Sequence, residues 1–193
     1  MKVIDFEINK FEDFVRNHFG QILGSNQNVL IVAVAEGGIP VAELVRGIFV
    51  EQNSNPEILR IKAQRPSTKQ KKSGKFSKAV IKTVFRFLPK FLLDKFRVWE
   101  HLYLSKNRIQ ERKIIQINEL KSSQFDLVLI VDDAVDSGIT MKKVIEFTRG
   151  KLGNSPEIKT LAVALTQKNP VYSPDFCMFQ NVLIRFPWSL DGK

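Results

Sequence analysis

Apolar residues along the chain alternate between the spacing of helices and the short continuous runs of buried strands. Residues 11–22 place phenylalanine, valine and isoleucine at roughly helical intervals, which predicts a helix near the amino terminus. Residues 28–35 are instead a short apolar run rich in valine, typical of a strand that is buried on both faces, as in parallel sheets. The sequence EGGIP interrupts the apolar pattern, and residues 41–52 then predict a second helix.

The same alternation continues toward the carboxyl terminus. After the strongest apolar run, residues 125–133, a loop of small residues precedes a predicted helix at 141–152. Because strand, turn and helix follow one another, the pattern predicts an α/β fold, a Rossmann-like and mostly parallel sheet that is flanked by helices. The remaining strands are predicted at 57–64, 112–117, 158–168 and 181–188.

One segment, residues 65–111, does not follow this alternation. It begins with the composition of a loop and then mixes Phe, Leu and Trp with Lys and Arg, which predicts one or two amphipathic helices broken near Pro89. Residues 60–113 hold 17 of the 30 lysines and arginines but only 3 of the 20 acidic residues. Because large apolar side chains need a partner surface, we expect this basic insertion to dock on its own domain or a second subunit. We favour these over the alternative, a membrane surface contacted through 76–104.

Composition indicates a globular chain and argues against several classes of protein. With 193 residues, 44% of them hydrophobic, residues 1–193 are expected to fold as a single domain. The only cysteine, Cys177, excludes an internal disulfide and favours a reducing compartment. We expect a cytoplasmic protein, since neither a signal peptide nor a long apolar stretch is visible. The two histidines, His18 and His101, are far apart in the sequence, which argues against a zinc site. No helix-turn-helix or other nucleic-acid recognition motif is visible, which argues against a nucleic-acid partner.

Three aspartates follow the strongest apolar run. Asp132 and Asp133 stand at the end of this predicted strand, and in an open α/β sheet ligands bind at the carboxyl ends of the strands. Asp136 opens a loop of small residues that leads into a helix, where backbone N–H groups and the hydroxyls of Ser137 and Thr140 suit a phosphate. A carboxylate pair suits a sugar diol. The sequence therefore predicts a site for a sugar phosphate.

Two other protein classes also place acidic residues after an apolar strand. A phosphate-binding-loop NTPase needs the pattern GxxxxGK[ST], but Lys69 and Phe76 stand at two of the required positions around Gly74-Lys75. A response-regulator receiver would carry its acidic pair near the start of the chain, whereas only 60 residues follow Asp133. The pair alone also fits a strand that simply ends in a charged turn, and the DSGxT pattern after it argues against that interpretation.

The complete pattern VLIVDDAVDSGIT, residues 128–140, resembles the phosphoribosyl-diphosphate (PRPP) motif of type I phosphoribosyltransferases. The stretch VAVAEGGIPVAELV resembles the pyrophosphate loop of the same family, and LIRFPW resembles the carboxyl-terminal motif of its bacterial and archaeal purine-type members. The resemblance covers residues 28–50 and 112–188. It implies the type I phosphoribosyltransferase fold, with the basic insertion 65–111 at the position of the mobile catalytic loop.

The resemblance also implies a role for individual residues. Asp132 and Asp133 would face the ribose hydroxyls of PRPP and help to hold Mg²⁺, mainly through the substrate. An aspartate at position 136 resembles the motif of the 6-oxopurine branch, in which this carboxylate is the general acid/base beside N7 of the base. Lys168, or Gln167 one residue earlier, would contact the 6-oxo group of the base. Phe186 would also contact the base. The pyrophosphate would be bound by Glu36, Gly37 and Gly38. The 5-phosphate would be bound by Asp136, Ser137, Gly138, Ile139 and Thr140.

The resemblance therefore implies a transferase that uses PRPP and Mg²⁺. It would transfer ribose 5-phosphate to a nucleobase-like acceptor such as a 6-oxopurine, release pyrophosphate, serve nucleotide salvage and form a homo-oligomer, with a dimer expected. Two departures from the family pattern keep a second hypothesis open. Glu36 stands where the pyrophosphate loop usually carries Arg or Lys, and residues 182–184 lack the aromatic ring that stacks on a purine. The alternative is a non-catalytic PRPP-sensing regulator or binding protein whose basic insertion contacts an anionic partner.

Overall fold

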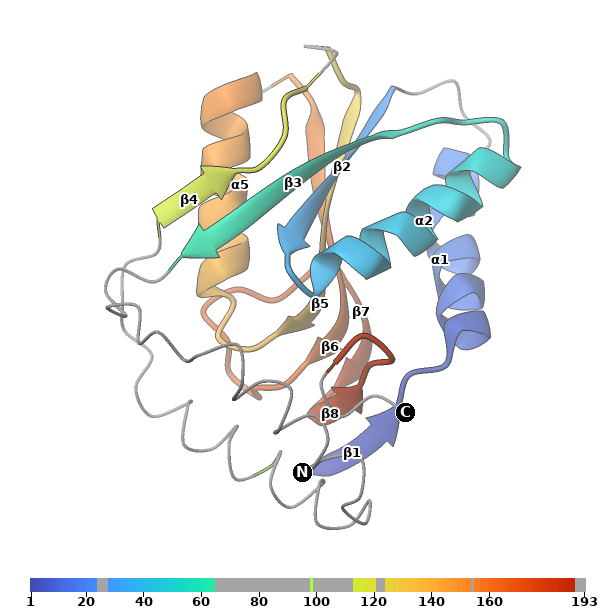
Figure 1. The fold of residues 1–193 in the computed structure, drawn as a ribbon, viewed down its shortest axis with the longest axis vertical. Helices are drawn as coiled ribbons and strands as arrows, with labels where there is room; N and C mark the ends of the chain where they lie inside the picture. Colours follow the sequence, from blue (N-terminus) through green and yellow to red (C-terminus); the bar gives the residue numbers. More distant parts are fainter. Residues whose placement is uncertain (24–27, 65–97, 99–112, 121–123, 154, 190–193) are drawn as a thin grey trace, which may run out of the picture.

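A computed structural model describes residues 1–23, 28–64, 98, 113–120, 124–153 and 155–189 (Figure 1). Its centre is a six-stranded sheet with the strand order β4-β3-β2-β5-β6-β7. All neighbouring strands in this sheet are parallel except β3 and β4, which are antiparallel. The strands are β2 (Val29–Ala35), β3 (Glu57–Gln64), β4 (Lys113–Gln116), β5 (Leu127–Val135), β6 (Glu157–Leu165) and β7 (Phe176–Gln180).

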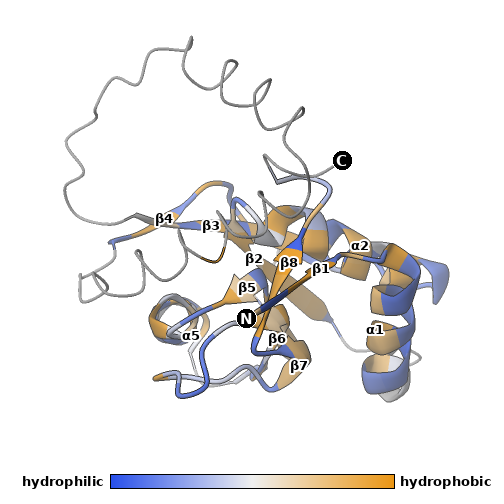
Figure 2. Ribbon diagram, turned by 90° about the horizontal axis from the view of Figure 1, so that it is seen from below, coloured by the Kyte–Doolittle hydropathy of each residue, from blue (hydrophilic) through white to orange (hydrophobic). Residues whose placement is uncertain are grey.

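Helices cover both faces of this sheet. Helices α1 (Ile8–Leu23) and α2 (Gly38–Glu51) pack on one face, and α5 (Ile139–Leu152) packs on the other (Figures 1 and 2). Successive residues of a strand point to opposite faces, so Ile31 joins the core beneath α2 while Val32 joins the core beneath α5. The centre of the sheet is therefore buried on both sides, which explains the continuous apolar runs of β2 and β5.

A second, two-stranded sheet lies beyond the carboxyl ends of the central strands (Figure 1). It pairs β1 (Lys2–Asp5) in parallel with β8 (Val182–Arg185), so the first strand of the chain lies beside the last strand that the structure describes. An aromatic cluster packs beneath it, with ring centroids 5.3 Å apart for Phe6 and Phe186 and 5.0 Å apart for Phe186 and Trp188. This small sheet covers the edge at which ligands bind in α/β folds.

The structure confirms the predicted α/β class and corrects some of its elements. Two strands, β1 and β7, were not predicted. Helix α2 begins at Gly38, three residues before the predicted start, because a helix tolerates a proline such as Pro40 in its first turn, where backbone N–H groups have no partner within the helix. The strand predicted at 181–188 is shorter, Val182–Arg185.

Some predictions fall outside the described part of the chain. Apart from Val98, the whole basic insertion 65–111 lies there, so its helices, its docking surface and its membrane contact through 76–104 stay predictions. Among the helices that the structure describes, none is long and apolar enough to cross a membrane.

Candidate ligand site at the carboxyl edge of the sheet

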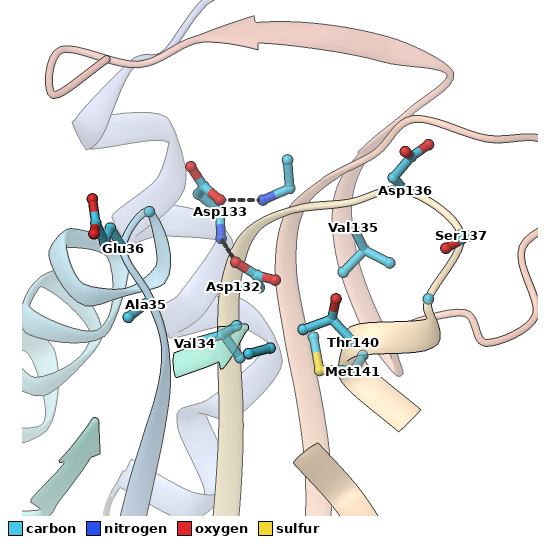
Figure 3. Close-up of a pocket in the computed structure, with 14 residues that line it drawn as sticks. Val34, Ala35, Glu36, Asp132, Asp133, Val135, Asp136, Ser137, Thr140 and Met141 are labelled. Carbon is cyan, nitrogen blue, oxygen red and sulfur yellow. Dashed lines mark hydrogen bonds between the residues drawn. The ribbon is translucent and has the colours of Figure 1, made fainter. Parts of the chain in front are cut away.

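A cavity of about 290 Å³ opens at the carboxyl ends of β2 and β5 (Figure 3). Its lining comes from residues 34–37 at the end of β2, from Ala63 of β3, and from 132–141 without Ile139. The structure therefore brings the three predicted aspartates together with Glu36 and Gly37. The predicted site residues that do not line this cavity are Gly38, Ile139, Lys168 and Phe186.

The carboxylate pair lies in the last residues of β5. Asp132 Oδ1 accepts a hydrogen bond from the Asp133 backbone N–H at 2.9 Å, and Asp133 Oδ1 accepts one from the Ala134 N–H at 2.8 Å. Burial raises the pKa of the Asp133 carboxyl, and contacts with Asp132, the Ala134 N–H and Trp188 lower it in part. The backbone around the pair thus fixes both carboxylates at the cavity.

The two glycines of the EGGIP loop allow this loop to approach β5. A Cβ atom on Gly37 would lie 2.0 Å from Asp133 Oδ2, and one on Gly38 would lie 2.6 Å from the backbone oxygen of Val131. Larger residues at either position would push the loop away from the carboxylate pair. Gly38 therefore serves the site through packing, although it does not line the cavity.

The loop after β5 has the geometry of an anion site. Gly138 has a φ of 76° and immediately precedes α5, so the N–H groups of the first helical turn, which have no partner within the helix, face the loop. The hydroxyl-bearing residues Ser137 and Thr140 also line the cavity. The segment after β6 also holds this loop, because the Val171 N–H donates to the Ser137 backbone oxygen at 2.8 Å.

Asp136 is oriented by a residue that the sequence did not indicate. The hydroxyl of Thr166 donates to Asp136 Oδ1 at 2.9 Å, and the Thr166 N–H donates to the Val135 oxygen at 2.9 Å. Thr166 is buried and directly follows β6, the neighbour of β5. The sequence prediction placed Thr166 inside a strand at 158–168, whereas β6 ends at Leu165, so Thr166 lies at the edge of the sheet where ligands bind in this fold class.

The pyrophosphate-loop position holds an ion pair. The Glu36 side chain is 83% exposed, and its Oε1 atom lies 3.1 Å from Lys62 Nζ of β3. The peptide bond between Ala35 and Glu36 is cis. The negative side chain at this position is thus balanced by a lysine from the neighbouring strand.

The two predicted base-binding residues lie outside the cavity lining. Lys168 is exposed in the loop after β6, and Phe186 is buried in the aromatic cluster at 4% exposure. Both roles stay predictions. Trp188 lies close enough to Asp133 to lower its pKa, although its buried N–H makes no hydrogen bond of normal geometry within the described residues.

The carboxylate pair is the best candidate for a metal ligand. No group of three or more His, Cys, Asp or Glu residues in the described ranges is arranged to hold a metal ion by itself. The carboxylate oxygens of Asp132 and Asp133 suit Mg²⁺, which commonly takes its remaining ligands from water and substrate phosphates. The donor set therefore fits a magnesium ion that is held jointly with a bound substrate.

Solved structures of purine phosphoribosyltransferases have the same fold. The purine phosphoribosyltransferase of Pyrococcus horikoshii Ot3 aligns with a TM-score of 0.58 at 17% identity, covering 98% of this chain and 95% of that chain. The xanthine-guanine-hypoxanthine phosphoribosyltransferase of Helicobacter pylori aligns with a TM-score of 0.59 at 16% identity, with the same coverage. The Trypanosoma cruzi hypoxanthine phosphoribosyltransferase in complex with the product IMP gives 0.53 at 12% identity, covering 92% and 78%. No curated protein matches the chain by sequence.

A sequence model of the phosphoribosyl transferase domain matches residues 6–191. The match includes the EGGIP loop, the three aspartates and the carboxyl-terminal FPW. It spans nearly the whole chain, and the fold agrees with the type I architecture of the aligned structures. The chain therefore belongs to the phosphoribosyl transferase domain family.

Proposed function

We propose that the protein transfers the ribose 5-phosphate group of PRPP to a nucleobase, with a 6-oxopurine as the preferred acceptor class, and releases pyrophosphate. One observation carries this proposal. A single cavity gathers the carboxylate pair of β5, the loop before α5 and the EGGIP loop. These three parts match the diol, the 5-phosphate and the diphosphate of PRPP in turn.

Binding follows from the chemistry of each part. The carboxylates of Asp132 and Asp133 accept hydrogen bonds from the ribose 2- and 3-hydroxyls. The N–H groups at the start of α5, with Ser137 and Thr140, bind the 5-phosphate. The backbone N–H groups of residues 36–38 remain for the diphosphate. When Mg²⁺ is bound through Asp132, Asp133 and the substrate, it neutralises charge on the leaving pyrophosphate.

The transfer exchanges one bond at ribose C1 for another. The bond from C1 to the pyrophosphate oxygen breaks with its electron pair, and a bond forms from C1 to a ring nitrogen of the base. The base loses a proton, which Asp136 accepts while Thr166 orients its carboxylate. The negative charge of Asp132 and Asp133 favours the positive charge that builds on the ribose ring.

A pyrophosphate-release assay tests this proposal. The full chain is incubated with PRPP, Mg²⁺ and a panel of purine and pyrimidine bases, and PRPP binding is measured in parallel by calorimetry. We expect turnover with a 6-oxopurine. Asp136→Asn should bind PRPP within a fewfold of the wild type and turn over about 10²- to 10⁴-fold more slowly, because it keeps the shape but removes the base. Equal turnover of the variant would remove Asp136 from the mechanism.

A second candidate function is a PRPP sensor without catalysis. Glu36 favours it, because a carboxylate at the diphosphate position opposes the binding of the leaving group that catalysis must stabilise. PRPP binding by calorimetry without pyrophosphate release from any acceptor would support the sensor. Turnover with any base would exclude it.

A further inference from the structure

The cavity carries more negative charge than a diphosphate favours. Its described lining includes the carboxylates of Glu36, Asp132, Asp133 and Asp136, and none of the described lining residues is a lysine or an arginine. A diphosphate near Glu36 would meet a like charge that nothing in this described lining balances. A ligand with this group therefore needs a cationic side chain from beyond these lining residues.

Lys62 is placed to supply that charge. It lies on β3, in register with Ala35 of β2, so it stands beside the start of the EGGIP loop. Its Nζ atom is 3.1 Å from Glu36 Oε1, and Ala63, the next residue, lines the cavity. The side chains of Lys62 and Glu36 are 42% and 83% exposed, so both have room to move. The Lys62 amine therefore lies at the rim of the cavity, next to one of its lining residues.

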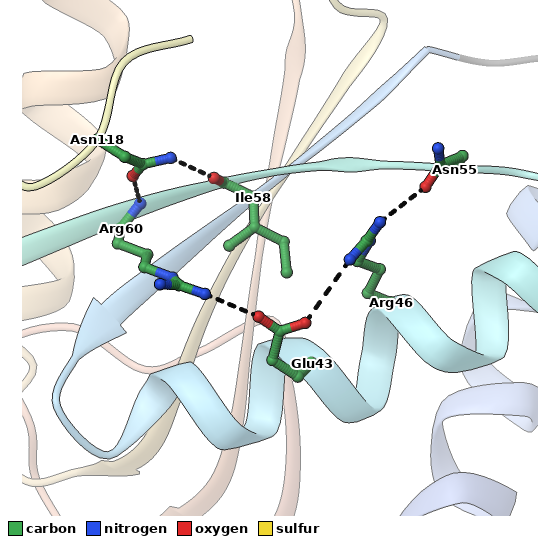
Figure 4. Close-up of polar contacts among 6 residues, drawn as sticks. All are labelled: Glu43, Arg46, Asn55, Ile58, Arg60 and Asn118. Atoms are coloured by element: carbon green, nitrogen blue, oxygen red, sulfur yellow. Dashed lines mark hydrogen bonds and ion pairs between the residues drawn. The ribbon is translucent and has the colours of Figure 1, made fainter. Parts of the chain in front are cut away.

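A second ion pair on the same strand shows what an ordinary surface contact looks like. Arg60 lies two residues before Lys62 and on the same face of β3, and it contacts Glu43 of α2 at 3.0 Å (Figure 4). Its exposure resembles that of Lys62, but neither Arg60 nor Glu43 lines the cavity. The Lys62–Glu36 pair differs because its acidic member belongs to the cavity itself.

We infer that Lys62 is the cation for the diphosphate of PRPP, and that Glu36 holds its amine at the rim until the ligand binds. The inference rests on the proposed function and adds a residue from another strand to it. On binding, the Lys62 amine exchanges the Glu36 carboxylate for phosphate oxygens, and Glu36 turns toward solvent. In this chain the positive charge for the diphosphate thus comes from the end of β3, whereas the family pattern has an Arg or Lys in the loop.

Calorimetry with three anions tests this role in the full chain with Mg²⁺ present. PRPP and pyrophosphate carry a diphosphate, and ribose 5-phosphate does not. Lys62→Gln should weaken PRPP and pyrophosphate binding about five- to thirty-fold, as expected for a partly solvated charge-assisted contact, and leave ribose 5-phosphate within about twofold. Lys62→Arg should restore most of the diphosphate affinity. Glu36→Gln should tighten pyrophosphate binding about two- to fivefold, because it removes the competing carboxylate.

The Arg60–Glu43 pair provides the matched controls. Arg60→Gln and Glu43→Gln change the charge of the same surface by the same amount, and they should leave all three affinities unchanged. Unchanged PRPP affinity in Lys62→Gln, or an equal loss for ribose 5-phosphate, would overturn the inference and leave the proposed function standing. Weaker pyrophosphate binding by Glu36→Gln would show that Glu36 does not compete with the ligand for Lys62, and it would overturn the proposed exchange of partners. A wild type that binds neither PRPP nor pyrophosphate would overturn both the inference and the proposed function.

Discussion

At the scale of single residues, the proposed proton transfer depends on how Asp136 is held. A carboxylate at the start of a loop can adopt several rotamers, and the proposed transfer needs one that reaches the base. The hydrogen bond from Thr166 selects a rotamer, because the buried hydroxyl is itself fixed at the end of β6. We therefore regard Thr166 as a positioning residue that acts through Asp136.

Thr166→Val tests this positioning role. Valine keeps the shape of threonine and removes the hydroxyl, so the fold should persist while Asp136 loses this one hydrogen bond. We expect kcat to fall about tenfold or more, as for a lost hydrogen bond to a charged group, with PRPP affinity unchanged. Thr166→Ser should restore kcat, because it returns the hydroxyl. If Thr166→Val slows the Asp136→Asn variant as much as it slows the wild type, its effect does not act through the carboxylate, and the positioning role is wrong.

The sequence could predict some site residues and not others. Asp132, Asp133 and Asp136 follow one another on one strand and its loop, so their spacing alone indicates a shared site. Thr166 and Lys62 reach the site from the ends of two other strands, and only the order of strands in the sheet brings them there. A single polar residue near the end of a predicted strand carries no pattern that separates it from an ordinary surface residue.

At the scale of elements, the loop before α5 depends on close backbone contact. A Cβ atom on Gly138 would lie 2.1 Å from the backbone oxygen of Tyr172 and 2.7 Å from its nitrogen. This contact is with backbone, which cannot turn aside as a side chain can. The glycine therefore permits both the left-handed turn and the packing of the segment around Tyr172 against the loop.

Gly138→Ala should consequently destabilise the protein and disturb the anion site together. The left-handed φ costs about 1–2 kcal/mol for a residue with a Cβ, and displacement of the Tyr172 segment adds to it. Thermal unfolding should show a lower midpoint, and ribose 5-phosphate affinity should fall. Gly150→Ala in the same helix is the control, since nothing lies within 4 Å of its added Cβ, and it should be neutral or slightly stabilising. A Gly138→Ala variant as stable as the wild type would contradict the role of this contact.

Burial explains which elements the pattern could predict. Strands β2 and β5 are buried almost throughout, and their continuous apolar runs are visible in the sequence. Strand β1 is partly exposed, and β7 is an edge strand that is mostly half-buried, so neither shows a clear run. The pairing of β1 with β8 joins residues about 180 positions apart, such as Lys2 and Val182, which no local pattern reveals.

At the scale of the whole molecule, the described fold is continuous across the basic insertion. Strands β3 and β4 are antiparallel neighbours, and Gln64 pairs with Lys113, so the chain leaves and re-enters the sheet at adjacent points. Beyond β4, the Asn118 side chain fastens the returning chain to β3, accepting from the Arg60 N–H at 2.7 Å and donating to the Ile58 oxygen at 2.8 Å (Figure 4). The two chain ends of β3 and β4 are therefore close enough for a short hairpin turn to join them.

Replacing residues 66–110 by a short Gly-Ser linker should leave a folded protein that captures substrate poorly. The replaced residues carry 12 basic and 2 acidic side chains, so we expect them to attract a ligand with several phosphates. We expect the loss in PRPP capture to be largest at low salt, where this attraction is least screened. Stopped-flow binding of PRPP at two ionic strengths measures the effect, and circular dichroism checks the fold. An equal loss at both ionic strengths would contradict the electrostatic role, and wild-type binding to anionic but not neutral vesicles, abolished by the replacement, would instead assign the insertion to a membrane surface.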